Sequence, residues 1–150
     1  MSKPSFVYVT YIATTPEKLF GALTDPEMTK QYWYHHRNAS DWKPGSAWRH
    51  EDYVKSDKAE IVGKVVEVSP PKRLVFTWHF PGEEQDPSKH SKVTFNIEPL
   101  AGMVRLTVLH EELEAGSKMF EGIQKGWPEV LASLKSLLET GRALPRSTGK

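Results

Sequence analysis

The chain has 150 residues, of which 38% are hydrophobic, and its 20 basic residues nearly balance 19 acidic ones. This length is enough for one domain that buries about 70% of the surface of its unfolded form. The net charge of +1 creates no overall field that would attract nucleic acid or an anionic membrane. The absence of cysteine excludes disulfides, thiolate metal sites and a cysteine nucleophile.

No stretch of the sequence resembles a membrane span or a signal peptide. The amino-terminal segment FVYVTYI is short and mixes polar with apolar residues, whereas a span needs roughly 18 to 20 apolar residues. We therefore expect a cytoplasmic protein without membrane insertion.

The first elements are a strand and two short helices. Residues 5–12 are rich in β-branched and aromatic side chains, which predicts a strand. Thr15 and Asp25 each stand directly before a proline, the order typical of a helix cap followed by the first helical residue. We expect helices over about 16–23 and 26–33.

Strand patterns then recur as far as residue 113. Residues 48–53 alternate in the manner of a half-buried strand. Residues 60–80 hold two strands around the turn SPPKR, and residues 91–113 hold two more around PLAG. Between these hairpins, residues 81–90 form a charged surface loop. The run HEELE that begins at residue 110 is interpreted as a solvated strand end.

A long amphipathic helix is predicted from Ser117 to Gly141. Apolar residues recur there at three- and four-residue spacing, and Gly141 is a typical terminating residue. Gly126 and Pro128 disfavour a helix but flank Trp127 inside this pattern. A helix kinked at this point, with Trp127 directed into the interior, reconciles the two signals.

These elements predict one α+β domain. A sheet of about six antiparallel strands with one apolar face needs a cover, and the last helix can supply it. The core would extend over about 6–140, and residues 143–150 lack periodicity and are expected to form a mobile tail.

The order of these segments resembles a known superfamily. The motifs TTPEKLFGALTDPEMTKQYW, GKVVEVSPPKRLVFTW, VRLTVLHEEL and GWPEVLASLKSLL resemble the START-like (SRPBCC) superfamily, in the branch named after the carboxy-terminal domain of the activator of heat-shock protein 90 ATPase. The resemblance implies a helix-grip fold, in which a curved antiparallel sheet grips the carboxy-terminal helix. It also implies a cavity between the two, which members use for lipids, sterols, polyketides or other apolar molecules.

The resemblance and the strand faces together give a set of candidate site residues. Aromatic side chains would form the walls of the cavity, and two histidines would supply its polar groups. We expect a ligand to contact Trp33, Trp48, His50, Phe76, Trp78, Phe95, Val108, His110, Trp127 and Leu131. Residues 32–36, YWYHH, are interpreted as a loop at the cavity mouth.

The sequence supports neither a metal site nor a known catalytic motif. His35 and His36 are adjacent and cannot both face one ion from a regular helix, and no His-x-x-x-His pair accompanies them. There is no G-x-S-x-G and no phosphate-binding glycine loop. We expect no metal, no cofactor and no assigned catalytic residue.

Three functions stay open at this stage. The first is binding of a small apolar or amphipathic molecule. The second is a cyclase or hydratase that works through His50 or His110. The third is a protein-interaction module with an unspecified partner, which predicts an exposed apolar patch and a filled cavity.

Overall fold

A long sheet and one long helix make up most of the computed structural model, which describes residues 3–54 and 58–145. Its elements follow one another as β1 (Phe6–Ile12), α1 (Pro16–Thr24), α2 (Pro26–Tyr32), β2 (His36–Ser40), β3 (Ala47–Asp52), β4 (Lys58–Ser69), β5 (Arg73–Trp78), the short 3₁₀ helix η1 (Pro87–Lys89), β6 (Ser91–Leu100), β7 (Met103–Glu111) and α3 (Lys118–Thr140).

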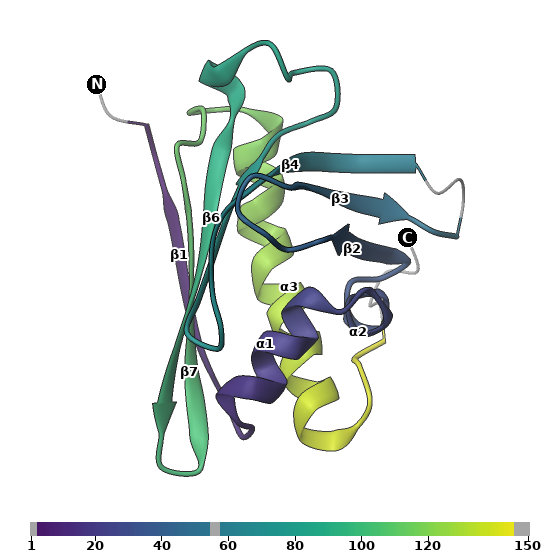
Figure 1. Ribbon diagram of the computed structural model, residues 1–150, viewed down its shortest axis with the longest axis vertical. Helices are drawn as coiled ribbons and strands as arrows, with labels where there is room; N and C mark the ends of the chain where they lie inside the picture. Colours follow the sequence, from purple (N-terminus) through teal and green to yellow (C-terminus); the bar gives the residue numbers. More distant parts are fainter. Residues whose placement is uncertain (1–2, 55–57, 146–150) are drawn as a thin grey trace.

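All seven strands join one antiparallel sheet in the order β1-β7-β6-β5-β4-β3-β2. In Figure 1 the strands β1, β6 and β7 run along one side, while β2, β3 and β4 cross to the other, so that the sheet curves around α3. Two irregularities in the pairing of β4 accompany this curvature, as expected because bulges bend a strand. The predicted α+β helix-grip fold is confirmed.

The helix boundaries follow from the capping residues named in the sequence. Thr15 Oγ1 accepts the N–H of Lys18 at 3.2 Å, and Asp25 Oδ1 accepts the N–H of Glu27 at 2.9 Å. Gly141 ends α3 with a φ of 85°, a left-handed conformation that glycine adopts at little cost. Both short helices and the long one therefore lie where the sequence predicted them.

The long helix α3 runs unbroken past the two residues that disfavour it. Pro128 lies inside the helix and, lacking an N–H, cannot bond the carbonyl of Gln124. Trp127 beside it is only 2% exposed. Burial of this ring on the concave face of the sheet offsets the weak helix propensity of its neighbours. A kink at Pro128 stays a prediction, and the inward direction of Trp127 is confirmed.

One strand escaped the sequence analysis. The interpretation of residues 32–36 as a mouth loop is wrong at both ends, since Tyr32 is fully buried in α2 and His36 begins β2. The hydroxyl of Tyr32 donates to the carbonyl of Ala22 at 2.9 Å. Strand β2 has the sequence HRNAS, which lacks the apolar alternation of a strand, and it forms because β3 offers a free edge for pairing.

The run HEELE is not a solvated strand end throughout. His110 and Leu113 are buried, while Glu112 and Glu114 are exposed. His110 continues the inward face of β7 that Val108 also occupies, so the alternation of the strand extends further than the charged residues suggested.

The carboxy-terminal residues beyond α3 are partly in contact with it. Ala143 packs against the core, and the N–H of Leu144 donates to Ser133 Oγ at 3.1 Å. Residues 146–150 of the expected mobile tail lie outside the described residues. None of the helices in the described ranges is both long and apolar enough to cross a membrane.

A close contact between β4 and β5 gives a test of the fold. A Cβ at Gly63 would lie 1.9 Å from the carbonyl oxygen of Thr77 and 2.5 Å from Trp48 Nε1, two atoms joined by a 2.6 Å hydrogen bond. We expect Gly63→Ala to lower the free energy of unfolding by about 3 kcal/mol, because backbone must move and the bond is disturbed.

The comparison variant is Gly21→Ala in α1, where an added Cβ meets no atom within 4 Å. That change should raise stability by up to about 1 kcal/mol. Urea unfolding of both variants measures the difference. Equal stabilities would contradict the close approach of β4 and β5 at Gly63.

Candidate ligand-binding cavity

A cavity of about 240 Å³ opens between the first turns of α3 and the ends of β4 and β5. Most of its wall is apolar, and Lys118 is its one charged side chain. The wall consists of Trp33, Ile61, Trp78, Phe80, Lys118, Met119, Gly122, Ile123, Gly126, Trp127 and Val130. Such a lining is typical of sites for small apolar molecules.

Three of the ten predicted contact residues form part of this wall, namely Trp33, Trp78 and Trp127. The other seven belong to the packed interior behind it. They are Trp48, His50, Phe76, Phe95, Val108, His110 and Leu131, and all are buried. Ligand contact by the ten residues stays a prediction. Of these ten, the three tryptophans are the ones that line the cavity.

The three wall tryptophans are packed edge to face or at a tilt. The ring of Trp127 lies 5.6 Å from that of Trp33 and 5.5 Å from that of Trp78. Trp78 Nε1 also donates to the sulfur of Met119 at 3.0 Å. Each ring is thus held by the next, so the wall is formed before any ligand arrives, which reduces the entropy lost on binding.

Glycine keeps the helix side of the cavity open. Gly122 and Gly126 lie one turn apart on α3, and an added Cβ at either meets no atom within 4 Å. Both belong to the cavity wall. A larger side chain on this face of the helix would occupy the cavity, which gives a physical reason for the poor helix residue beside Trp127.

The buried His110 is held in one protonation state by its neighbours. Trp127 Nε1 donates to His110 Nδ1 at 3.0 Å, so this nitrogen carries no proton. The proton is on Nε2, which donates to Ser91 Oγ at 2.8 Å, and Ser91 donates in turn to the carbonyl of Trp78. Burial lowers the pKa of His110 to about 3. Both ring nitrogens of His110 and the hydroxyl of Ser91 therefore have hydrogen-bond partners, as is typical of a buried histidine with a structural role.

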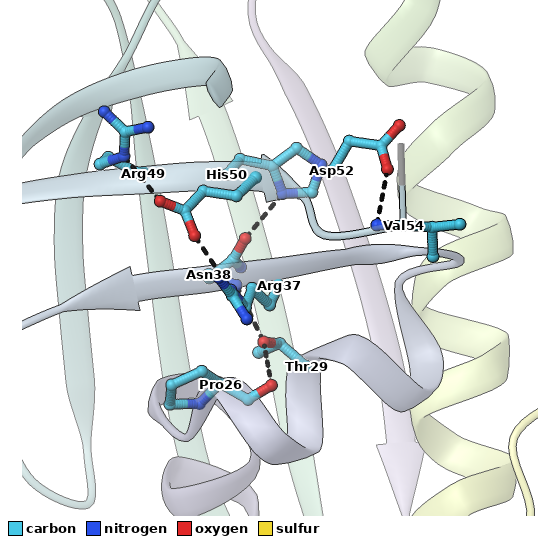
Figure 2. A network of polar contacts seen from close by, with 9 residues as sticks. Pro26, Thr29, Arg37, Asn38, Arg49, His50, Asp52 and Val54 are labelled. Atoms are coloured by element: carbon cyan, nitrogen blue, oxygen red, sulfur yellow. Dashed lines mark hydrogen bonds and ion pairs between the residues drawn. The ribbon is translucent and has the colours of Figure 1, made fainter. Parts of the chain in front are cut away.

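His50 belongs to a second network of hydrogen bonds, near the edge of the sheet formed by β2 (Figure 2). Its Nδ1 donates to Asn38 Oδ1 at 2.7 Å, and the N–H of Asn38 donates to Thr29 Oγ1 at 2.9 Å. Thr29 then donates to the carbonyl of Pro26. The network joins β3, β2 and α2. Burial, with a smaller effect of the neighbouring His36, lowers the pKa of His50 to about 3.

The wall residues that sequence reasoning missed come mainly from the start of α3. Met119, Ile123 and Val130 share the helical spacing of Trp127, so the apolar stripe predicted their burial. It could not separate the residues that face the open cavity from those that face the packed core. Phe80 lies past the end of β5 and is 39% exposed, so it forms part of the mouth of the cavity.

The curved antiparallel sheet around α3 (Figure 1) defines a helix-grip protein, and solved structures share this architecture. Protein MLL2253 of Mesorhizobium loti is 26% identical, with a TM-score of 0.74, and the match covers 90% of this chain and 96% of that one. The Aha1 dimer of Colwellia psychrerythraea is 20% identical, with a TM-score of 0.76 and coverage of 93% and 99%. An HSP90 activator from Plasmodium falciparum is 22% identical, with a TM-score of 0.74 and coverage of 89% and 95%.

The family follows from the sequence itself. The family model described as "Activator of Hsp90 ATPase homolog 1-like protein" matches residues 13–139, and the chain therefore belongs to this family. The comparison with curated proteins found no match. The resemblance noted from the four sequence motifs is confirmed.

The state of His110 predicts how stability depends on pH. The unfolded chain binds a proton at this residue below about pH 6.5, whereas the folded protein does so only near its pKa of about 3. The stabilising contribution is complete above pH 6.5 and is lost as the pH falls toward 3. Between pH 7.5 and 5.0 it should decrease by about 2 kcal/mol.

Urea unfolding at the two pH values, in the wild type and in His110→Gln, isolates this effect. The amide of glutamine offers one acceptor and one donor but does not titrate. We expect the variant to lose about 2 kcal/mol less than the wild type over this interval. An equal loss in both proteins would show that His110 does not exclude a proton.

Proposed function

We propose that this protein binds one small apolar or amphipathic molecule in the cavity between α3 and the sheet. The observation that carries the proposal is the cavity itself, which is apolar on nearly all sides and built on three interlocked tryptophans. Its single charged lining residue, Lys118, lies at the first position of α3. A polar or anionic end of the ligand would point toward this ammonium group.

The volume of the cavity limits the size of the ligand. An apolar cavity of roughly 150 Å³ takes a benzene molecule, and the cavity here measures about 240 Å³. A molecule with one or two rings, or a short alkyl chain, fits this space. Larger lipids would require the mouth near Phe80 to open.

The catalytic alternative is weakened by the positions of its two histidines. Neither His50 nor His110 belongs to the cavity wall. His110 has both nitrogens engaged, and Ser91 donates its proton to a carbonyl rather than to the imidazole. A general base needs a free nitrogen within reach of the substrate, and His110 offers none in this arrangement.

The protein-interaction alternative has one specific observation in its favour. Edge strand β1 exposes Val7, Val9 and Tyr11 on its outer side, and a similar fold occurs in an HSP90 activator. This alternative also predicts a filled cavity, however, and the space lined by Trp127 argues against it. Ligand binding is therefore the function that the geometry supports best.

Native mass spectrometry of the purified protein, followed by solvent extraction, is the direct test for a bound molecule. A stoichiometric small molecule lost on denaturation would support the proposal and identify the class of ligand. A panel of one- and two-ring aromatics and short-chain carboxylic acids then gives affinities through the shift in melting temperature.

Gly126→Leu should block the cavity without unfolding the protein. Leucine has the better helix propensity by about 0.8 kcal/mol, and the added side chain enters the open space beside Trp127. We expect at least a tenfold weaker affinity for every panel ligand that binds the wild type. Gly21→Leu, a helical glycine of α1 outside the cavity wall, is the matched control and should leave affinity unchanged.

Two results would count against the proposal. The first is that no panel ligand shifts the melting temperature of the wild type, which would favour the protein-interaction alternative. The second is equal affinity in the wild type and in Gly126→Leu, which would place binding elsewhere on the protein.

A further inference from the structure

A group of one histidine and two carboxylates lies at the end of the sheet formed by β2, β3 and β4. His36, Asp52 and Glu60 each offer one ligand atom, and these atoms lie within 4.8 Å of one another. They come from three different strands. The sequence analysis predicted no metal site, because it compared only residues that are close in the chain.

Strand pairing brings the three side chains to one face. His36 lies directly opposite Asp52 in the pairing of β2 with β3. The pairing of β3 with β4 is irregular at this level. His50 lies opposite Ile61 and Glu51 lies opposite Ala59, so that no residue of β3 lies directly opposite Glu60. A bulge of this kind redirects a side chain, and Glu60 Oε1 reaches His36 Nε2 at 2.7 Å.

The ring of His36 is oriented so that Nε2 faces the carboxylates. Its Nδ1 lies 2.9 Å from the carbonyl of Tyr34 and must donate to it. The ring also stacks on His50, with centroids 4.6 Å apart and planes 4° apart, and Asn38 fixes His50 in turn. In metal sites, a histidine ligand usually donates its other ring N–H to a carbonyl or carboxylate, which sets the tautomer.

Asp52 is held in a comparable way. It is 4% exposed, and its Oδ1 accepts the N–H of Val54 at 3.0 Å (Figure 2). The side chain of Glu60 is 55% exposed and that of His36 is 18% exposed. The group therefore combines two ligands oriented by the fold with one that borders solvent, from which an ion can enter.

From this geometry we propose that His36 Nε2, Asp52 and Glu60 bind a divalent transition-metal cation. One imidazole and two carboxylates suit ions such as Zn²⁺ and Mn²⁺ better than Mg²⁺, which favours oxygen ligands alone. Zinc bonds of about 2.0–2.2 Å separate neighbouring tetrahedral ligand atoms by about 3.3 Å. The three ligand atoms already lie within 4.8 Å of one another, and the 2.7 Å contact between His36 and Glu60 would lengthen by about 0.6 Å to reach this spacing.

His36 Nε2 and Glu60 Oε1, 2.7 Å apart, are the two closest atoms of the proposed site. Three protein ligands leave at least one coordination position open, as in sites where the ion contacts a further molecule. The site is separate from the apolar cavity, because none of its three residues belongs to the cavity wall. It does not depend on the proposed ligand.

Titration of Zn²⁺ into the metal-free protein, followed by isothermal calorimetry and by the melting temperature, tests the proposal. We expect one ion per chain and a rise in melting temperature, with a weaker response to Mn²⁺ and none to Mg²⁺ at the same concentration. Glu60→Gln and His36→Gln should each weaken Zn²⁺ binding by about tenfold or more.

The matched control is His35→Gln, which removes the adjacent, exposed histidine and should leave the affinity unchanged. Because the side chain of Glu60 is 55% exposed, we expect Glu60→Gln to disturb the fold less than His36→Gln. The circular dichroism spectrum of the metal-free variant, recorded in EDTA, checks that it is folded. The proposal is overturned if Zn²⁺ does not bind the wild type. It is equally overturned if Glu60→Gln binds as tightly as the wild type, or if His35→Gln alone loses binding.

Discussion

The structure depends most on the burial of Trp127 against the concave face of the sheet. Its ring contacts Trp33, Trp78, Phe95 and His110, and its Nε1 donates to His110 Nδ1. Truncation of such a buried ring typically costs about 3–5 kcal/mol, which is comparable with the roughly 4 kcal/mol by which a glycine and a proline disfavour a helix. The same indole fixes the tautomer of a buried histidine and forms one side of the cavity, so that fold, protonation state and site are linked through one side chain.

Apolar and polar side chains occupy different parts of the sheet. The β5-β6-β7 part presents a packed apolar face to α3, broken only by the satisfied chain from Trp127 through His110 to Ser91. The β2-β3-β4 part carries His36, His50 and the carboxylates of Asp52 and Glu60. Trp33 lies between the two parts, in contact with His50 on one side and Trp127 on the other. The proposed apolar-ligand cavity and the proposed cation site therefore lie in separate parts of one small domain.

The sequence was most informative where one side-chain pattern had a single physical solution. Capping residues located the helices, two turn motifs located the hairpins, and alternation along β7 gave its buried face. It was least informative for the site. Trp33, Trp78 and Trp127 were predicted and line the cavity, but other predicted residues lie behind the wall. Periodicity identifies the buried side of a helix or strand and contains no information on where the buried surface leaves a void.

By itself, the sequence determined the family, the order of the three α-helices and of every strand except β2, and the direction in which each of these elements turns its apolar side. These properties depend on residues close together in the chain, whose spacing either matches a helix or strand or does not. The tertiary structure decided the rest. Strand β2 exists because β3 has an edge to pair with, and His36, Asp52 and Glu60 meet only through strand register and a bulge in β4. Such juxtapositions depend on pairing between distant segments, which no local pattern encodes.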